Sequence, residues 1–148
     1  ALDKIVESQS GLWNIAYQPL GFLLFYLASL ALAFLPPFDL PQARGELAGG
    51  VFAAYTGWRM ALIRFARLVL ILTLSLSVTA LFLGGWQGPL IPPFAWLFLK
   101  TITVACSFFF VGRYVSRVQH YTLLEASWKI ATPLALLNIF WVGVLLLI

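Results

Sequence analysis

The sequence predicts an all-α polytopic membrane protein with about four transmembrane helices and an N-terminal interfacial helix. Hydrophobic residues make up 62% of the 148 positions, charged residues make up 9%, and the mean hydropathy is +0.97. A soluble domain of this length has too little interior for so many apolar side chains, whereas lipid solvates the excess. Two long runs, residues 8–38 and 68–99, contain no Asp, Glu, Lys or Arg. These observations predict one membrane domain over residues 1–148.

Four segments provide the roughly 20 mostly apolar residues that a spanning helix needs. They cover residues 20–36, 60–85, 95–112 and 129–148. The second segment has a helical lead-in that carries three arginines, Arg59, Arg64 and Arg67. The third is interrupted by Lys100, which we expect either to extend toward the headgroups or to pair with an acid of another subunit.

Residues 1–17 predict a short helix that lies in the membrane interface. Leu2, Ile5 and Val6 recur at helical spacing opposite charged side chains, which is the pattern of an interfacial helix. The aromatic residues Trp13 and Tyr17 follow, and such rings favour headgroup depth. The alternative is a frayed terminus with no fixed structure.

Positive charge collects in two of the three turns between the predicted spans. The turn after the first span and its helical lead-in contain four arginines, and the turn after the third span contains three basic residues. Residues 86–94, between the second and third spans, carry no charge. By the positive-inside tendency, the two basic turns face the cytoplasm. Residues 37–50 are therefore predicted as a cytoplasmic loop of a multi-pass protein in the cell's inner (cytoplasmic) membrane.

This loop carries the strongest candidate site. The stretch Pro37-Phe38-Asp39-Leu40-Pro41 holds a carboxylate between two prolines where apolar segments meet, and Glu46 follows in the same loop. A carboxylate is costly to place in lipid, so a pair of them beside a membrane cavity could relay protons or orient a polar headgroup. The alternative is local: Asp39 caps a short helix that begins near Pro41, and Glu46 pairs with Arg44.

Several other classes of function are excluded by composition and spacing. The basic residues are scattered without a basic run, which argues against a nucleic-acid partner. Cys106 is the single cysteine, so the chain has no internal disulfide. No phosphate-binding loop, nucleophile triad, iron–sulfur or zinc spacing is present. We therefore expect no catalysis of covalent chemistry, no metal site and no cofactor bound by this chain alone.

Several motifs occur in collinear order along nearly the whole chain: Gln18-Pro19-Leu20-Gly21-Phe22-Leu23-Leu24-Phe25, Pro37-Phe38-Asp39-Leu40-Pro41, Glu46-Leu47-Ala48-Gly49-Gly50, Leu81-Phe82-Leu83-Gly84-Gly85-Trp86 and Pro133-Leu134-Ala135-Leu136-Leu137-Asn138. With these motifs the chain resembles the C-terminal half of the H subunit (subunit 1) of respiratory complex I, the proton-pumping NADH:quinone oxidoreductase. The combination of the proline-flanked loop and the Phe-Leu-Gly-Gly-Trp helix end is highly specific.

The resemblance implies a non-catalytic subunit that joins the membrane arm to the redox arm and helps to form the quinone chamber. It implies that residues 37–50 are part of that chamber, with Phe38, Asp39, Glu46 and Tyr55 as chamber residues and Asp39, Glu46 and Arg67 in proton relay or coupling. Quinone would be a substrate bound together with other subunits. The expected partners are the other membrane and peripheral subunits of complex I, lipid, and a further chain or segment that supplies the family's N-terminal half.

The chain departs from the family pattern mainly in its acids. The family usually has Glu at five positions that are Leu32, Gln42, Arg44, Ala54 and Arg67 here, and Asn and Arg where Phe34 and Leu35 stand. Because the apolar pattern is intact, these changes indicate a divergent paralogue with an altered acidic channel. Two alternatives remain: a structural scaffold without a quinone or proton role, and the equivalent subunit of a membrane-bound hydrogenase complex.

Overall fold

The computed structural model describes residues 2–38, 55–89, 92–115, 118 and 120–147, and within these ranges all regular structure is helical. The elements in chain order are α1 (Leu2–Glu7), α2 (Asn14–Tyr17), α3 (Pro19–Leu32), α4 (Trp58–Phe82), α5 (Pro93–Tyr114), α6 (His120–Ala126), the π-helical η3 (Ser127–Ala131) and α7 (Thr132–Leu147). The prediction of an all-α polytopic membrane protein is confirmed.

Three helical runs are long and apolar enough to cross a membrane. They are Trp58–Phe82, Pro93–Tyr114 and Tyr121–Leu145, the last of which passes through α6, η3 and α7. The shortest of the three has 22 residues, or roughly 33 Å at the α-helical rise, which matches a hydrocarbon core of about 30 Å. The fourth apolar helix, α3, has only 14 residues, so it is about 21 Å long.

Two helix boundaries differ from the predicted ones. We predicted the first span over residues 20–36, but α3 ends at Leu32 because Phe34 adopts a left-handed φ of 49° and turns the chain before the prolines. We predicted the last span from residue 129, but the helix begins at His120. Glu125 and Lys129 form an ion pair one turn apart on this helix, so its first turns tolerate charge.

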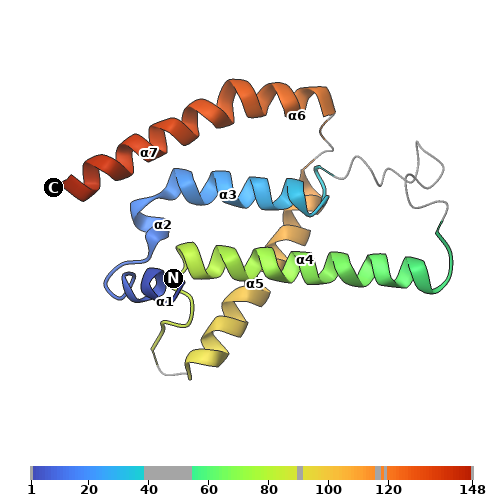
Figure 1. The fold of residues 1–148 in the computed structure, drawn as a ribbon, viewed down its shortest axis with the longest axis horizontal. Helices are drawn as coiled ribbons and strands as arrows, with labels where there is room; N and C mark the ends of the chain where they lie inside the picture. Colours follow the sequence, from blue (N-terminus) through green and yellow to red (C-terminus); the bar gives the residue numbers. More distant parts are fainter. Residues whose placement is uncertain (1, 39–54, 90–91, 116–117, 119, 148) are drawn as a thin grey trace.

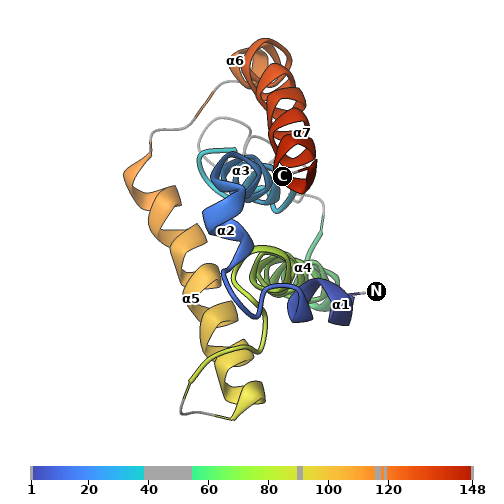
Figure 2. The same cartoon turned by 90° about the vertical axis from the view of Figure 1, so that its left-hand side faces the viewer.

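The helices form a small bundle in which α3 lies between α4 and α7 (Figures 1 and 2). α3 and α4 run antiparallel, and α5 crosses both obliquely (Figure 2). The core lies where α3, α4 and α5 meet, and its buried apolar residues are Leu30, Ala33, Leu35, Ile71, Val78, Val104, Ala105 and Phe108. The Tyr26 and Phe108 rings pack with centroids 4.8 Å apart, and the Tyr26 and Ser107 hydroxyls are hydrogen-bonded at 2.7 Å.

The run from α6 to α7 contains a π-helical turn immediately before Pro133. Proline has no N–H to donate to the carbonyl four residues earlier, so an α-helical turn is disfavoured at this point. The Thr132 N–H instead bonds the Ser127 carbonyl, five residues back. Further along, Asn138 approaches α3 so closely that a Cβ at Gly21 would lie 2.9 Å from its amide nitrogen. Glycine at position 21 therefore permits the contact between α3 and α7.

The predicted orientation assigns the two ends of the bundle to opposite sides of the membrane. The end of α3, the start of α4, the end of α5 and the start of α6 lie toward one end of the bundle, whereas α1, α2, the end of α4 and the start of α5 lie toward the other (Figure 1). We expect a cysteine placed at the exposed Thr56, in a Cys106→Ala background, to react with a membrane-impermeant maleimide only from the cytoplasmic side. A cysteine at the exposed Ser10 should react only from the opposite side. Labelling with the two sides exchanged would disprove the orientation.

Candidate functional site

The segment between the end of α3 and the candidate loop is a tightly held turn of residues 33–38, here called the α3 turn. Leu35 donates its backbone N–H to the Leu30 carbonyl at 3.1 Å, and Phe38 donates to the Leu35 carbonyl at 2.8 Å. Leu35 is buried in the core, and Phe38 is half-buried against it. Phe34 has a left-handed φ, which is strained for a phenylalanine. Such a conformation persists only where surrounding contacts hold the backbone in place.

Two contacts from elsewhere in the chain fix the α3 turn. The guanidinium of Arg67, on α4, donates a hydrogen bond of 2.5 Å to the Phe34 carbonyl. The backbone N–H of Val118 donates to the Pro37 carbonyl at 3.1 Å. The last carbonyls of a helix have no partners within it and carry the negative end of its dipole, so a cation suits this place. Arg67 therefore stabilises the turn from which the candidate loop departs.

The predicted site residues fall into two groups. Phe38 and Arg67 are both at the α3 turn, one as part of it and one bonded to it. Tyr55 is 43% exposed and lies three residues before α4. Asp39 and Glu46, with most of the predicted loop 37–50, lie outside the described residues. Whether the two carboxylates face each other, or face Arg67, thus stays a prediction.

A second cluster of polar residues was not predicted from the sequence. It surrounds the C-terminal end of α4 at the opposite end of the bundle, and we call it the polar clasp: Gln9, Asn14, Gln87 and Lys100. Lys100 is 7% exposed, and its ammonium donates to the carbonyls of Leu83 at 2.6 Å, Gln87 at 2.7 Å and Gly85 at 3.3 Å. These bonds use all three of its donors.

Two amide side chains of the polar clasp, Gln9 and Asn14, cap carbonyls that α4 leaves unpaired, and the Gln87 amide donates to the Val6 carbonyl at 2.6 Å. Gln9 is 1% exposed, donates to the Ala80 carbonyl at 3.1 Å and accepts a bond from the Gly84 N–H at 3.0 Å. The Asn14 amide donates to the Leu81 carbonyl at 2.9 Å. Because Gly84 and Gly85 have positive φ values of 70° and 51°, the chain turns sharply enough to reach these groups.

The polar clasp holds chain segments together, since each of its four side chains donates a hydrogen bond to a backbone carbonyl of another segment. The Lys100 ammonium also lies 4.3 Å from the centre of the Trp13 ring, a favourable cation–π distance. This arrangement replaces both earlier alternatives for Lys100, extension toward the headgroups or pairing with an acid. The sequence signal was a single lysine in an apolar span. In the described ranges, His, Cys, Asp and Glu form no group that could hold a metal.

The fold and the α3 turn define a polytopic helical membrane protein in which contacts from α4 and from Val118 fix the turn that follows α3. Residues 1–143 match the profile of the family described as NADH dehydrogenase, and the chain belongs to this family. The resemblance to the complex I membrane protein that the motifs indicated is thereby confirmed.

Individual relatives agree with the family assignment. The chain is 43% identical over 142 residues to the second H subunit of NADH-quinone oxidoreductase from Geobacter sulfurreducens, covering 96% of this chain and 43% of that protein. It is 40% identical over 147 residues to the first H subunit of the Geobacter metallireducens oxidoreductase, covering 99% and 45% of the two chains. It is 38% identical over 144 residues to the second H subunit of the Rhodopseudomonas palustris oxidoreductase, covering 97% and 45%. The chain thus spans less than half the length of the curated relatives it matches.

Proposed function

We propose that this chain is a membrane subunit of a complex I-like NADH:quinone oxidoreductase. It helps to form the quinone chamber and the junction to the proton-pumping arm, and it catalyses no covalent step itself. In this proposal Phe38 and Tyr55 form part of the chamber wall. Asp39 and Glu46 act as relay carboxylates, and Arg67 takes part in coupling. Quinone binds together with other subunits, in the cytoplasmic (inner) membrane.

The observation that carries the proposal is the fixed α3 turn in a chain of this family. The turn is held by one bond from α4 and one from the segment after α5, and it ends one residue before Asp39. A carboxylate that relays protons must be held at a constant distance from its partners. An anchored turn that ends one residue before Asp39 supports such a role, whereas a loop that only filled space would not need the anchor.

The role of Asp39 is tested by Asp39→Asn in the assembled complex. We expect the NADH:quinone reductase rate to fall by at least about tenfold, because an amide neither takes up nor releases a proton. The matched control is Glu125→Gln, which removes an acid that pairs with Lys129 on the surface of α6. This control should leave the rate unchanged. Co-purification of the other subunits shows that both variants assemble.

An unchanged rate in Asp39→Asn would rule out the relay role and would leave the scaffold alternative. The scaffold alternative is favoured by one observation: Arg67, where the family usually has an acid, bonds the α3 turn of its own chain. The hydrogenase alternative is tested by the subunits that co-purify in mild detergent. A nickel–iron large subunit in place of NADH-oxidising subunits would overturn the complex I-like assignment.

A further inference from the structure

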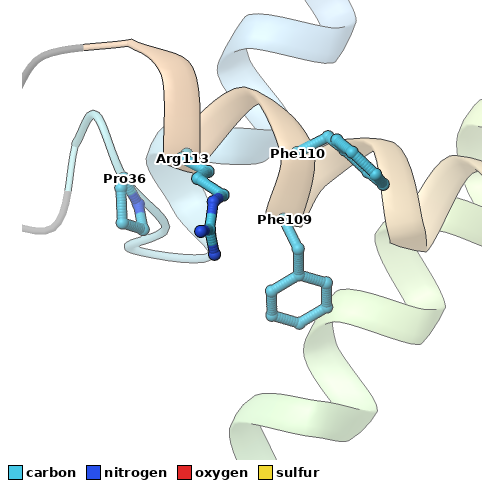
Figure 3. Close-up of a pocket in the computed structure, with 5 residues that line it drawn as sticks. Pro36, Phe109, Phe110 and Arg113 are labelled. Atoms are coloured by element: carbon cyan, nitrogen blue, oxygen red, sulfur yellow. The ribbon is translucent and has the colours of Figure 1, made fainter.

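A groove lies between the end of α5 and the α3 turn, at the end of the bundle that we assign to the cytoplasm (Figure 3). It has a volume of about 420 Å³ and is lined by Pro36, Phe109, Phe110, Gly112 and Arg113. Figure 3 shows the Arg113 side chain between Pro36 and the Phe109 ring. One cationic group therefore sits at an otherwise apolar groove.

Gly112 determines how closely the two walls of the groove approach. A Cβ at this position would lie 3.0 Å from the Pro36 carbonyl oxygen and 3.1 Å from the Pro36 Cβ. Any larger residue would push the α3 turn away from α5. The close approach fixes Pro36 beside α5, next to the residue that carries the positive charge, and so makes the groove part of the packed fold.

The Arg113 guanidinium is available to an anion. Its side chain is exposed, and within the described part of the chain it forms no hydrogen bond or ion pair. Arginine binds phosphate oxygens, like carboxylate oxygens, through two parallel N–H bonds. In the described ranges no acidic side chain lies among the lining residues to compete for this charge.

The position of Arg113 along α5 matches the depth of lipid phosphates. It lies in the last turn of a 22-residue helix that is long enough to cross the hydrocarbon core. Phe109 and Phe110 lie one turn deeper, at the level of acyl chains, and are 55% and 62% exposed. The charged and apolar parts of the groove thus have the same order, from surface to interior, as a phospholipid.

We propose that this groove binds one anionic phospholipid of the cytoplasmic leaflet. The phosphate pairs with Arg113, and an acyl chain lies along Phe109 and the Pro36 ring. A free phosphate would use only the charged end and would leave the apolar wall uncovered. A lipid of net negative charge is favoured over a zwitterionic one, because the zwitterionic headgroup adds a cation near Arg113. This inference does not depend on the proposed function.

The test uses the full chain with its co-purifying subunits and phospholipids that carry a photoreactive group on the acyl chain. We expect photoreactive phosphatidylglycerol to crosslink to the peptide that contains Phe109, and Arg113→Gln to reduce this crosslinking about tenfold, as the loss of a charge-assisted pair predicts. Arg113→Lys, which keeps the charge but not the two parallel N–H bonds, should retain only part of the crosslinking. Phosphatidylcholine should crosslink less than phosphatidylglycerol, and inorganic phosphate should not compete.

The matched control is Arg64→Gln, which removes an exposed arginine of α4 that does not line the groove. It should leave crosslinking unchanged, and an unchanged thermal transition shows that both glutamine variants fold. Equal crosslinking in Arg113→Gln and the unsubstituted chain would overturn the proposal. Competition by inorganic phosphate would reduce the groove to a simple anion site, and crosslinks to a neighbouring protein alone would show that a protein partner fills it.

Discussion

We expect Lys100→Met to lower the free energy of unfolding by about 2–4 kcal/mol, because three backbone carbonyls lose a charged donor. Methionine fills a similar volume but donates no hydrogen bond. Lys100 is 7% exposed, so little water can replace its ammonium at the C-terminal end of α4. The cation–π contact with Trp13 disappears as well. The change is measured by thermal or denaturant unfolding of the chain in detergent micelles, followed by circular dichroism.

The same substitution at the surface provides the control. The Lys129 side chain is 71% exposed and pairs only along its own helix with Glu125. Lys129→Met should therefore change the free energy of unfolding by no more than about 0.5 kcal/mol. Similar losses for the two variants would mean that the polar clasp contributes nothing specific to stability.

The second large effect is expected for Phe108→Ala, with a loss of about 2–3 kcal/mol in the free energy of unfolding. Phe108 is fully buried where α3, α4 and α5 meet, and its ring contacts that of Tyr26. In a soluble protein the loss would be larger. In the membrane, lipid is as apolar as the core. The substitution therefore loses packing contacts but no hydrophobic free energy of transfer from water.

Phe98→Ala on the same helix is the matched control. Phe98 is 60% exposed, so its ring faces lipid or detergent rather than the core. Its truncation should cost less than about 0.5 kcal/mol. Unfolding in the same micelles compares the two variants directly. An equal loss at both positions would show that the contact between α3 and α5 is not the centre of the fold.

The sequence was sufficient for the fold class because hydropathy is a local property of each segment. Residues 60–85 and 95–112 were predicted as spans, and α4 and α5 contain nearly all of them. The end of α3 was not predicted because the apolar run continues through Phe34 and Leu35, and hydropathy does not distinguish a buried turn from a buried helix. The start of α6 was missed because its polar residues reduced the hydropathy without breaking the helix.

The contacts at the two ends of the bundle were harder to predict because their acceptors are backbone carbonyls. Lys100 was recognised as a charge within an apolar span, with an acidic partner as one alternative, and Arg67 was predicted to take part in coupling. Among the described residues, both cations donate hydrogen bonds to backbone carbonyl oxygens near helix ends. Every residue type presents that group, so no spacing or motif identifies it. Only the packing of segments distant in sequence determines which carbonyls are left for a cation to cap.

The π-helical turn before Pro133 sets the rotation of α7 about the helix axis relative to α6. A turn closed by a bond over five residues holds one residue more than an α-helical turn. Removing that extra residue would rotate the last 16 residues by about 100° relative to α6. Asn138 would then swing away from Gly21, and a different stripe of α7 would face α3. The extra residue thus lets α7 present a face to α3 that is not set by the face that α6 presents to its own neighbours.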